Sequence, residues 1–164
     1  MALSKSGMKS DFEALQESKP KDTAELAKKW AAAYDSYASG ASTGNGGSVI
    51  NAGKKSALEA TLQGALGTPD TPGIPAKVAA GWATGLLAYW GGTPFSPGSV
   101  PMPPFQLPGV AAPPLGLGAL VPALTAIYSK ENSASGFADE QATALDTCTK
   151  TVLVLFGPVP QPVS

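Results

Sequence analysis

The stretch VAAGWATGLLAYWGGTPFSPGSVPMPPFQLPGVAAPPLGLGALVPALTAIYS, residues 78 to 129, decides how this chain folds. It contains no Asp, Glu, Lys, Arg or His, and it holds two of the three tryptophans and the densest apolar runs. A segment of this length that faced water would normally display charge, because Lys, Glu and Asp are the residues that proteins keep at their surface. We therefore expect something other than water to cover this stretch.

The stretch divides into two helices joined by a proline-rich segment. Apolar residues recur at helical spacing over 76–90, where Gly81 and Gly85 form a GxxxG pair that either admits a close backbone or is fortuitous. Residues 91–114 carry eight prolines among apolar side chains, which forbids helix and central strand and favours an extended arm docked on another surface. A helix over 115–130 follows, with Pro122 tolerated if it stands in the first turn.

The rest of the chain reads as further small helices. Helical spacing predicts helices over 23–39, 56–66 and 136–147, the first with Asp22 as N-cap and Glu25 completing a capping box. Residues 1–21 read as an N-terminal arm or weak helix. The Gly-rich run ASTGNGGS after Gly40 reads as a flexible loop, since it lacks the GK[ST] ending of a phosphate-binding loop.

The end of the chain, TKTVLVLFGPVPQPVS, contains one strand over 149–156, after which alternate prolines prevent further pairing. This strand has no evident partner in the chain. We therefore expect it to pair with a neighbouring chain, and a short hairpin with Val49-Ile50 is the competing interpretation. The predicted fold is mainly α: about five helices from 22 to 148 including the proline-rich arm 91–114, preceded by residues 1–21 and followed by an extended tail, 149–164.

Composition restricts the possible functions of the 164-residue chain. Its formal net charge is −1, charged residues make up only 14%, and neither Arg nor His occurs, so we expect no direct contact with nucleic acid and no histidine base or ligand. The single cysteine, Cys148, reads as a buried small hydrophobe. Because the carboxylates lie on polar helix faces and form no metal-binding cluster, we expect no enzyme, cofactor, metal or small-molecule substrate.

Two functional interpretations remain, a structural subunit and a small membrane protein with a hairpin of two helices, 78–90 and 115–128. The first segment is short for a span, and the second, extended back to Gly109 to reach spanning length, contains Pro113, Pro114 and Pro122, so we favour the subunit. Low charge, an apolar proline-rich arm and a lone strand all suit surfaces that remain buried in an assembly. The predicted interface residues are Trp82, Trp90, Phe95, Phe105, Val152, Val154 and Phe156.

The combination of Ala-rich helices, low charge, a Gly-rich loop, a proline-rich apolar arm and an extended tail resembles the minor structural proteins of tailed bacteriophages. The subunits that it resembles are those of the neck or connector, the baseplate and the cement type. The resemblance is one of composition and arrangement over most of the chain, and no diagnostic motif carries it. It implies a virion component, assembled in the host cytoplasm from several symmetric copies with other structural proteins, and without catalysis.

Overall fold

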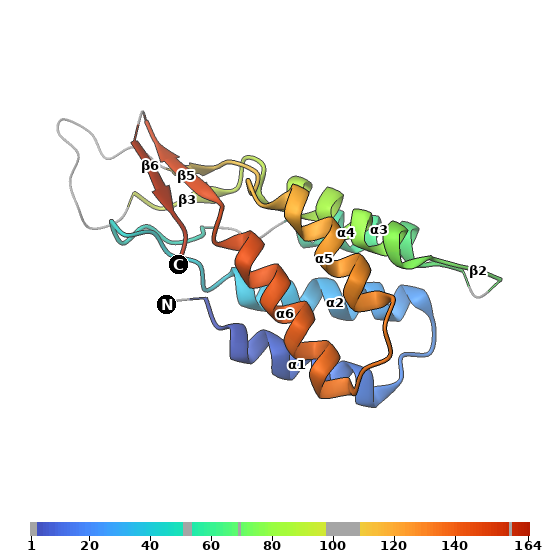
Figure 1. The fold of residues 1–164 in the computed structure, drawn as a ribbon. Helices are drawn as coiled ribbons and strands as arrows, with labels where there is room; N and C mark the ends of the chain where they lie inside the picture. Colours follow the sequence, from blue (N-terminus) through green and yellow to red (C-terminus); the bar gives the residue numbers. More distant parts are fainter. Residues whose placement is uncertain (1–2, 51–53, 69, 98–108, 158) are drawn as a thin grey trace.

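The computed structural model describes residues 3–50, 54–68, 70–97, 109–157 and 159–164 (Figure 1). The described helices are α1 (Lys5–Ser18), α2 (Thr23–Ala38), α3 (Lys55–Leu66), α4 (Pro75–Trp90), α5 (Leu117–Tyr128) and α6 (Ala134–Thr149). The described strands are β1 (Gly67–Thr68), β2 (Thr71–Pro72), β3 (Pro94–Phe95), β4 (Gly109–Ala111), β5 (Leu153–Phe156) and β6 (Val159–Pro162). The mainly α prediction is confirmed, and the structure adds a small sheet.

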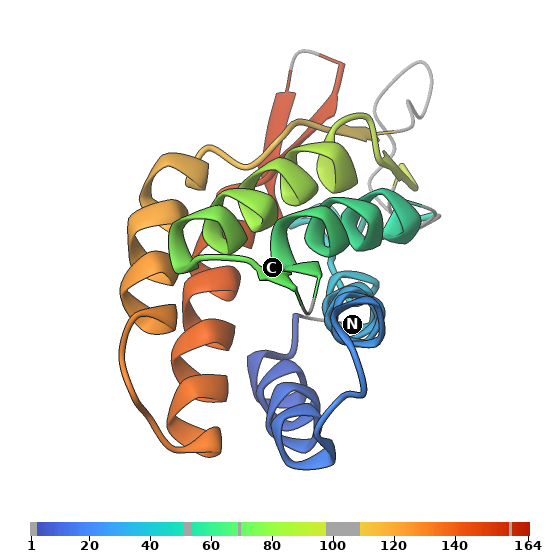
Figure 2. The ribbon, with the colours of Figure 1, turned by 90° about the vertical axis from the view of Figure 1, so that its right-hand side faces the viewer.

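The helices form a closed ring. Each helix packs on the next one along the chain, and α6, the last of them, packs on α1 as well. Figure 2 shows α3 and α4 side by side above α1, with α5 and α6 on one flank. The N-terminal segment is therefore a full part of the core, because α1 buries Met8, Phe12 and Leu15. The sequence predicts an arm or weak helix over residues 1–21, whereas the structure has the 14-residue helix α1 there, and this helix closes the ring.

Local signals explain where two of these helices begin. The Asp22 carboxylate accepts a hydrogen bond from the Glu25 backbone N–H at 2.7 Å, and the Glu25 carboxylate accepts one from the Lys21 N–H at 2.8 Å. The first bond satisfies a donor that the first turn of the helix leaves free, and the second joins Glu25 to the residue before the N-cap rather than to the N-cap itself. Helix α4 begins with Pro75, where the missing N–H costs nothing.

Helices α3 and α4 approach each other over the GxxxG pair. A methyl group built on Gly81 would lie 2.3 Å from the Ala65 Cβ, and one built on Gly85 would lie 2.5 Å from the Leu58 Cδ1. Any larger side chain at Gly81 would force the two backbones apart. The close-approach interpretation of the pair is therefore the right one, and the approaching helix belongs to the same chain.

Helix α5 accommodates a proline in its interior. It starts at Leu117, so Pro122 lies beyond the first turn, and the condition set from the sequence for tolerating this proline is not met. Proline removes the hydrogen bond to the carbonyl four residues earlier and crowds it. That residue is Gly118, which is exposed and has no side chain to add to the crowding.

An aromatic core runs through the ring of helices. Trp82 of α4 contacts Phe12 of α1 and both Trp30 and Tyr34 of α2, with ring centroids 5.8–6.3 Å apart. Stacking continues from Trp30 to Tyr128 of α5. A second branch runs from Tyr34 through Tyr89 and Trp90 to Phe95, which brings it to the strands.

The four strands β3 to β6 form an antiparallel sheet in the order β3-β4-β5-β6. Strand β5 thus has neighbours on both sides within its own chain, and the prediction that it pairs with a neighbouring chain is wrong. The alternate prolines of β6 do not prevent pairing, because in an antiparallel ladder only every second residue bonds to a given neighbour. Pro160 and Pro162 lie opposite Leu155 and Leu153, at the positions that do not donate to β5.

The Gly-rich run after α2 closes the edges of this sheet. It folds into a hairpin in which Ser42 pairs with Ser48, while Thr43 pairs with Val163 beyond β6 and Val49 pairs with Phe95 of β3. The pairing therefore runs around a small, barrel-like ring. The interpretation of this run as a flexible loop is therefore wrong. The alternative prediction, a hairpin between Val49-Ile50 and the strand at 149–156, is right only in that residues 49–50 pair, because their partner is β3.

The predicted proline-rich arm is only partly visible, since residues 98–108 lie outside the described residues. Its two described ends carry β3 and β4, which pair with each other antiparallel. These ends belong to the chain's own sheet, whereas the sequence predicts an extended arm docked on another surface. We call the sheet together with the hairpin, residues 41–50, the strand end of the molecule; in Figure 1 it lies at the left.

Candidate docking surface on the strand end

Buried tyrosines form the most conspicuous polar network. The Trp90 indole N–H donates to the Tyr34 hydroxyl at 2.8 Å, and Tyr34 and Thr149 share a hydrogen bond of 2.6 Å. Since the Thr149 hydroxyl donates to the Leu145 carbonyl, the Tyr34 hydroxyl is the donor to Thr149. The chain of hydrogen bonds ends on the backbone and leaves neither hydroxyl free for acid or base chemistry.

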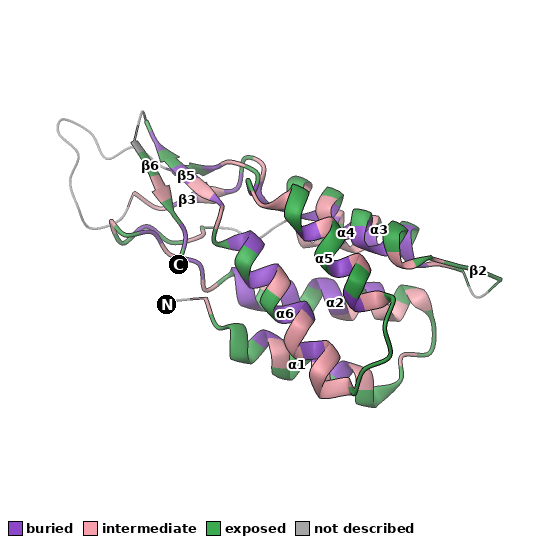
Figure 3. Ribbon diagram, in the orientation of Figure 1, coloured by how far each residue is buried: buried purple, intermediate pink, exposed green. Residues whose placement is uncertain are grey.

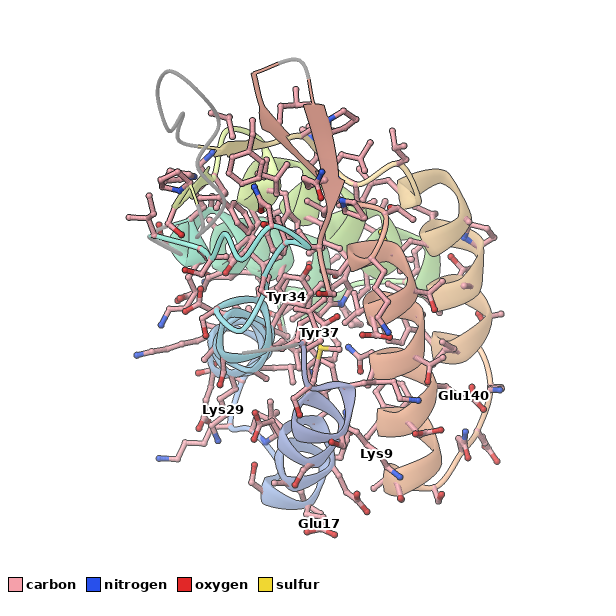
Figure 4. The ribbon with its side chains drawn as sticks, turned by 90° about the vertical axis from the view of Figure 1, so that its left-hand side faces the viewer. Lys9, Glu17, Lys29, Tyr34, Tyr37 and Glu140 are labelled. Carbon is pink, nitrogen blue, oxygen red and sulfur yellow. The ribbon has the colours of Figure 1, made fainter. Side chains whose placement is uncertain are left out.

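Two further tyrosines bind carboxylates. Tyr37 donates to Asp146 at 2.7 Å, and Tyr89 donates to Asp35 at 2.8 Å. Burial, reinforced by the neighbouring carboxylate, raises the pKa of both hydroxyls above the ordinary tyrosine value, so they remain protonated donors. Figure 4 shows Tyr34 and Tyr37 pointing inward from α2. These bonds tie α2 to α6 and α4, and we assign the network a structural role.

Cys148 and the carboxylates offer no reactive centre in the described part of the chain. Cys148 is buried, and burial raises the pKa of its thiol to about 11, which disfavours the thiolate. Among the described residues, no group of three or more metal-ligating side chains comes together. No described helix, including the two of the predicted membrane hairpin, has both the length and the apolar character needed to cross a membrane.

A groove of about 680 Å³ lies between α5 and α6. Buried Leu120, Ile127 and Cys148 contribute to its lining, together with small residues of α5 and threonines of α6. Asp139 and Glu140 stand at its far end, where each is paired with a lysine, Lys9 and Lys130 respectively. The groove is therefore apolar and free of unpaired charge along most of its length.

The inner face of the strand end is filled by large side chains. Phe95, Val154 and Phe156 are each at most 1% exposed, and Phe156 lies over two glycines. A methyl group on Gly109 would approach the Phe156 ring to 2.7 Å, and one on Gly47 would approach it to 2.8 Å. These glycines make room for the ring, so the strand end is a packed structure rather than a ligand-binding barrel.

The outer face of the strand end carries a continuous row of apolar side chains. Direct register partners follow one another across the sheet, from Pro94 to Val110, Leu155 and Pro160. Ile50 extends the row, because its N–H bonds to the Pro94 carbonyl. We call these five residues the outer band. Along β5, buried positions alternate with one intermediate and one exposed position (Figure 3).

The outer band is unusual for a face in contact with water. Ile50, Val110 and Leu155 are 59%, 48% and 44% exposed, and they are three of the six large hydrophobic residues that are exposed in the described chain. One face of an antiparallel sheet is normally polar when it is solvated. Contiguous exposed apolar groups of this kind mark surfaces that bind other molecules.

Charge is absent from every described segment that builds the strand end. Residues 36–50, 78–97, 109–129 and 151–164 contain no Asp, Glu, Lys, Arg or His. In Figure 4 the labelled ionic side chains Lys9, Glu17, Lys29 and Glu140 lie on the helical part of the molecule, away from the strands. The described segments of the strand end therefore carry no ionic side chain, and the Lys54 ammonium donates to the Gly91 carbonyl just before β3.

The predicted interface residues lie in the interior. Trp82, Trp90, Phe95, Val152 and Val154 are fully buried and Phe156 is 1% exposed, all within a single chain. Phe105 lies outside the described residues. The other six residues form part of the chain's own core, and this explains why no charge surrounds them. Their assignment to an interface is therefore wrong.

Sequence reasoning missed the residues of the outer band. One signal could have found them: the run VLVLF at 152–156 is apolar at successive positions, which is typical of a strand covered on both faces. The helices and the inner core cover one face only. The position of Ile50 and Val110 opposite this strand could not be read locally.

Comparisons of the chain with protein-family models, with curated proteins and with solved structures found no match.

Proposed function

We propose that the protein is a non-enzymatic structural subunit of a larger symmetric assembly, bound to other copies of itself and to other structural proteins. The observation that carries the proposal is the outer band on a charge-free strand end. Solvation of such a surface is unfavourable, and its burial against a neighbouring subunit would stabilise an assembly by the hydrophobic effect.

The extent of the outer band indicates what kind of contact it can make. Five neighbouring backbone segments about 4.8 Å apart span about 20 Å, so the apolar area is on the order of 250 Å². A stable pair of proteins usually buries about 800 Å² on each partner. The outer band alone would support weak association, and a lasting assembly needs a further surface on each subunit.

A place in a tailed-bacteriophage virion is the narrower form of the proposal. Its support is the resemblance in composition and arrangement to neck, baseplate and cement subunits. Assembly in the host cytoplasm follows from that resemblance as well. The wider proposal, a structural subunit, stands on the outer band independently of this resemblance.

Sedimentation velocity of the purified full chain over a wide concentration range tests the proposal. We expect the mean mass to rise with concentration and to be insensitive to added salt, because apolar contacts are not screened. Leu155→Lys should weaken association about tenfold or more, since it loses apolar burial and brings a charge into the contact.

Leu87→Lys on α4 is the matched control, because Leu87 is 51% exposed and also apolar but lies outside the outer band. It should leave association unchanged. A wild-type chain that remains monomeric at every concentration would overturn the proposal, as would equal weakening by the two lysine variants.

A further inference from the structure

We infer that two copies of this chain exchange helix α1, so that α1 of each copy, with the residues before it, packs between α2 and α6 of the other. We call this position the α1 seat; Figure 2 shows it occupied by the chain's own helix. The inference rests on the proposed function and deepens it, because it names the second contact that a lasting assembly requires.

The connection between α1 and α2 is strained at Lys19. Its φ angle is 44°, and among the described residues it is the only one other than glycine with a positive φ. This left-handed conformation is disfavoured about 5- to 30-fold for a residue that has a Cβ atom. Pro20 adds to the strain, because the residue before a proline prefers an extended backbone. The relaxed state of Lys19 is therefore extended, and an extended connection carries α1 away from its own core.

The end of α1 also lacks the hydrogen bond that usually accompanies such a conformation. The N–H that follows a left-handed residue normally bonds back to the last turn of the helix, but Pro20 has no N–H. At each of the other described helices, the N–H of the capping residue donates to the last turn. At α1 the Leu15 carbonyl accepts from the Ser18 hydroxyl at 3.0 Å, and the Lys19 N–H has no acceptor among the described residues.

The α1 seat already shows which partner it accepts. Three apolar residues of α1 are at most 6% exposed there, namely Met8, Phe12 and Leu15. The Phe12 ring lies 6.3 Å from the Trp82 ring, and the Lys9 ammonium lies 3.8 Å from the Asp139 carboxylate. A second copy presents the same helix, so each of these contacts forms again between chains. The exchange therefore uses only surfaces that the structure shows packed together.

Relief of the strain sets the concentration at which exchange occurs. For a short connection the effective concentration of α1 at its own seat is about millimolar, so unstrained chains would exchange only near that concentration. Exchange relaxes the connection in both copies, which favours the dimer about 30- to 900-fold. We therefore expect a dissociation constant on the order of 1–30 μM. When extended, residues 19–22 span about 13 Å, which allows α1 to reach an adjacent copy.

Sedimentation velocity of Lys19 variants tests the role of the strain. All are made in the full chain with Leu155→Lys, which weakens contacts through the outer band. Lys19→Gly removes the Cβ atom and with it the strain, so the dissociation constant of the dimer should rise about tenfold or more. Lys19→Ala is the matched control, because it removes the same charge but keeps the Cβ atom, and it should leave the dissociation constant unchanged.

Chemical cross-linking tests whether α1 itself is exchanged. One form of the full chain carries Lys9→Cys, and the other, lengthened by a tag, carries Asp139→Cys; both carry Cys148→Ala, and circular dichroism checks that they fold. After mixing at high concentration, a short bis-maleimide should join position 9 of one form to position 139 of the other. This product should exceed those that join two copies of one form several-fold, and it should decline when the mixture is diluted below the dissociation constant.

The other results overturn the inference in distinguishable ways. A dimer without the 9-to-139 product would be a side-by-side pair. Equal dimerisation of Lys19→Gly and Lys19→Ala would show that the strained connection does not drive exchange. In either case, association of the wild-type chain that Leu155→Lys weakens would leave the proposed function intact. A wild-type chain that remains monomeric at every concentration would overturn both.

Discussion

Replacing Gly81 with alanine is expected to force helices α3 and α4 apart. The new methyl group would lie 2.3 Å from the Ala65 Cβ, an atom fixed to the backbone of α3. Carbon atoms in contact settle at about 3.5–4.0 Å, so the helices must separate by about 1.3 Å or tilt. No rotation of a side chain can relieve this contact, because neither methyl group has a rotamer.

The net cost follows from two opposing terms. An additional methyl group in a packed core costs about 1–3 kcal/mol. Alanine is a better helix former than glycine by about 1 kcal/mol, which offsets part of that cost. We therefore expect Gly81→Ala to lower the free energy of unfolding by up to about 2 kcal/mol, measured by urea unfolding followed by tryptophan fluorescence and circular dichroism.

A double-mutant cycle separates the steric term from the propensity term. Ala65→Gly alone should cost about 2 kcal/mol, through lost helix propensity and one lost buried methyl group. In the Gly81→Ala, Ala65→Gly double variant, the methyl group enters the same space from the opposite helix. The propensity terms cancel, so stability should return to within about 1 kcal/mol of the wild type, with a coupling of about 2–3 kcal/mol.

Gly64→Ala is the control for this cycle. It lies in α3 as well, but a methyl group there would have no atom within 4 Å. It should raise stability by up to about 1 kcal/mol. The reasoning is refuted if Gly81→Ala stabilises the protein as Gly64→Ala does, or if the two substitutions of the cycle are additive.

Three further predictions concern the strand end and the tyrosines. Gly109→Ala should lower the free energy of unfolding by about 1–3 kcal/mol in the same urea assay, since its methyl group would lie 2.6 Å from Val154 Cγ1. An unchanged free energy of unfolding would contradict the packing described for Phe156. Tyr37→Phe should cost about 1.5–3 kcal/mol, because it removes a donor from the buried carboxylate of Asp146, and a loss near zero would show that the bond is dispensable. Burial raises the pKa of Tyr34, Tyr37 and Tyr89. Above about pH 10 the unfolded chain therefore loses tyrosine protons that the native chain retains. The free energy of unfolding should then fall by about 1.4 kcal/mol per pH unit for each of these tyrosines. Tyrosinate absorbance should then appear together with the loss of helical circular dichroism, and its appearance while the helices persist would disprove the assignment.

The helices could be predicted because their signals are local. Periodic apolar residues placed the predicted helix 76–90 within one residue of α4, and the Asp22 cap marked the start of α2. The arrangement of these helices in a ring could not be predicted, since it depends on contacts such as that between α1 and α6 at opposite ends of the chain. Local periodicity carries no information on which apolar faces meet.

The strand end escaped prediction for a different physical reason. Strands β3 and β4 are two and three residues long, too short to show the alternation that identifies a strand. Their pairing depends on partners far along the chain, such as Val110 with Leu155. Prolines in β6 argued against pairing, yet they occupy positions that need no donor on the side of β5.

The candidate docking surface shows the same division. Large apolar side chains of the described part of 78–129, such as Trp82 and Trp90, are covered by the core of the chain itself, whereas Leu87 and Leu115 of the same stretch are exposed. What remains exposed are moderate-sized residues such as Val110 on short strands. Their importance arises only when pairing brings them into a row with Ile50 and Leu155.

The circular pairing of the strand end has a consequence for biosynthesis. Its pairing segments come from separate parts of the chain, 42–50, 94–96, 109–112, 152–157 and 159–164, and β6 together with Val163 and Ser164 is made after the others. On the ribosome, helices α1 to α4 can therefore form while the ring of strands is still open. Joining contacts so distant in sequence is slow, and it leaves apolar strands uncovered until β5 and β6 emerge. Nascent chains stalled before residue 152 should accordingly bind chaperones more strongly than completed chains do.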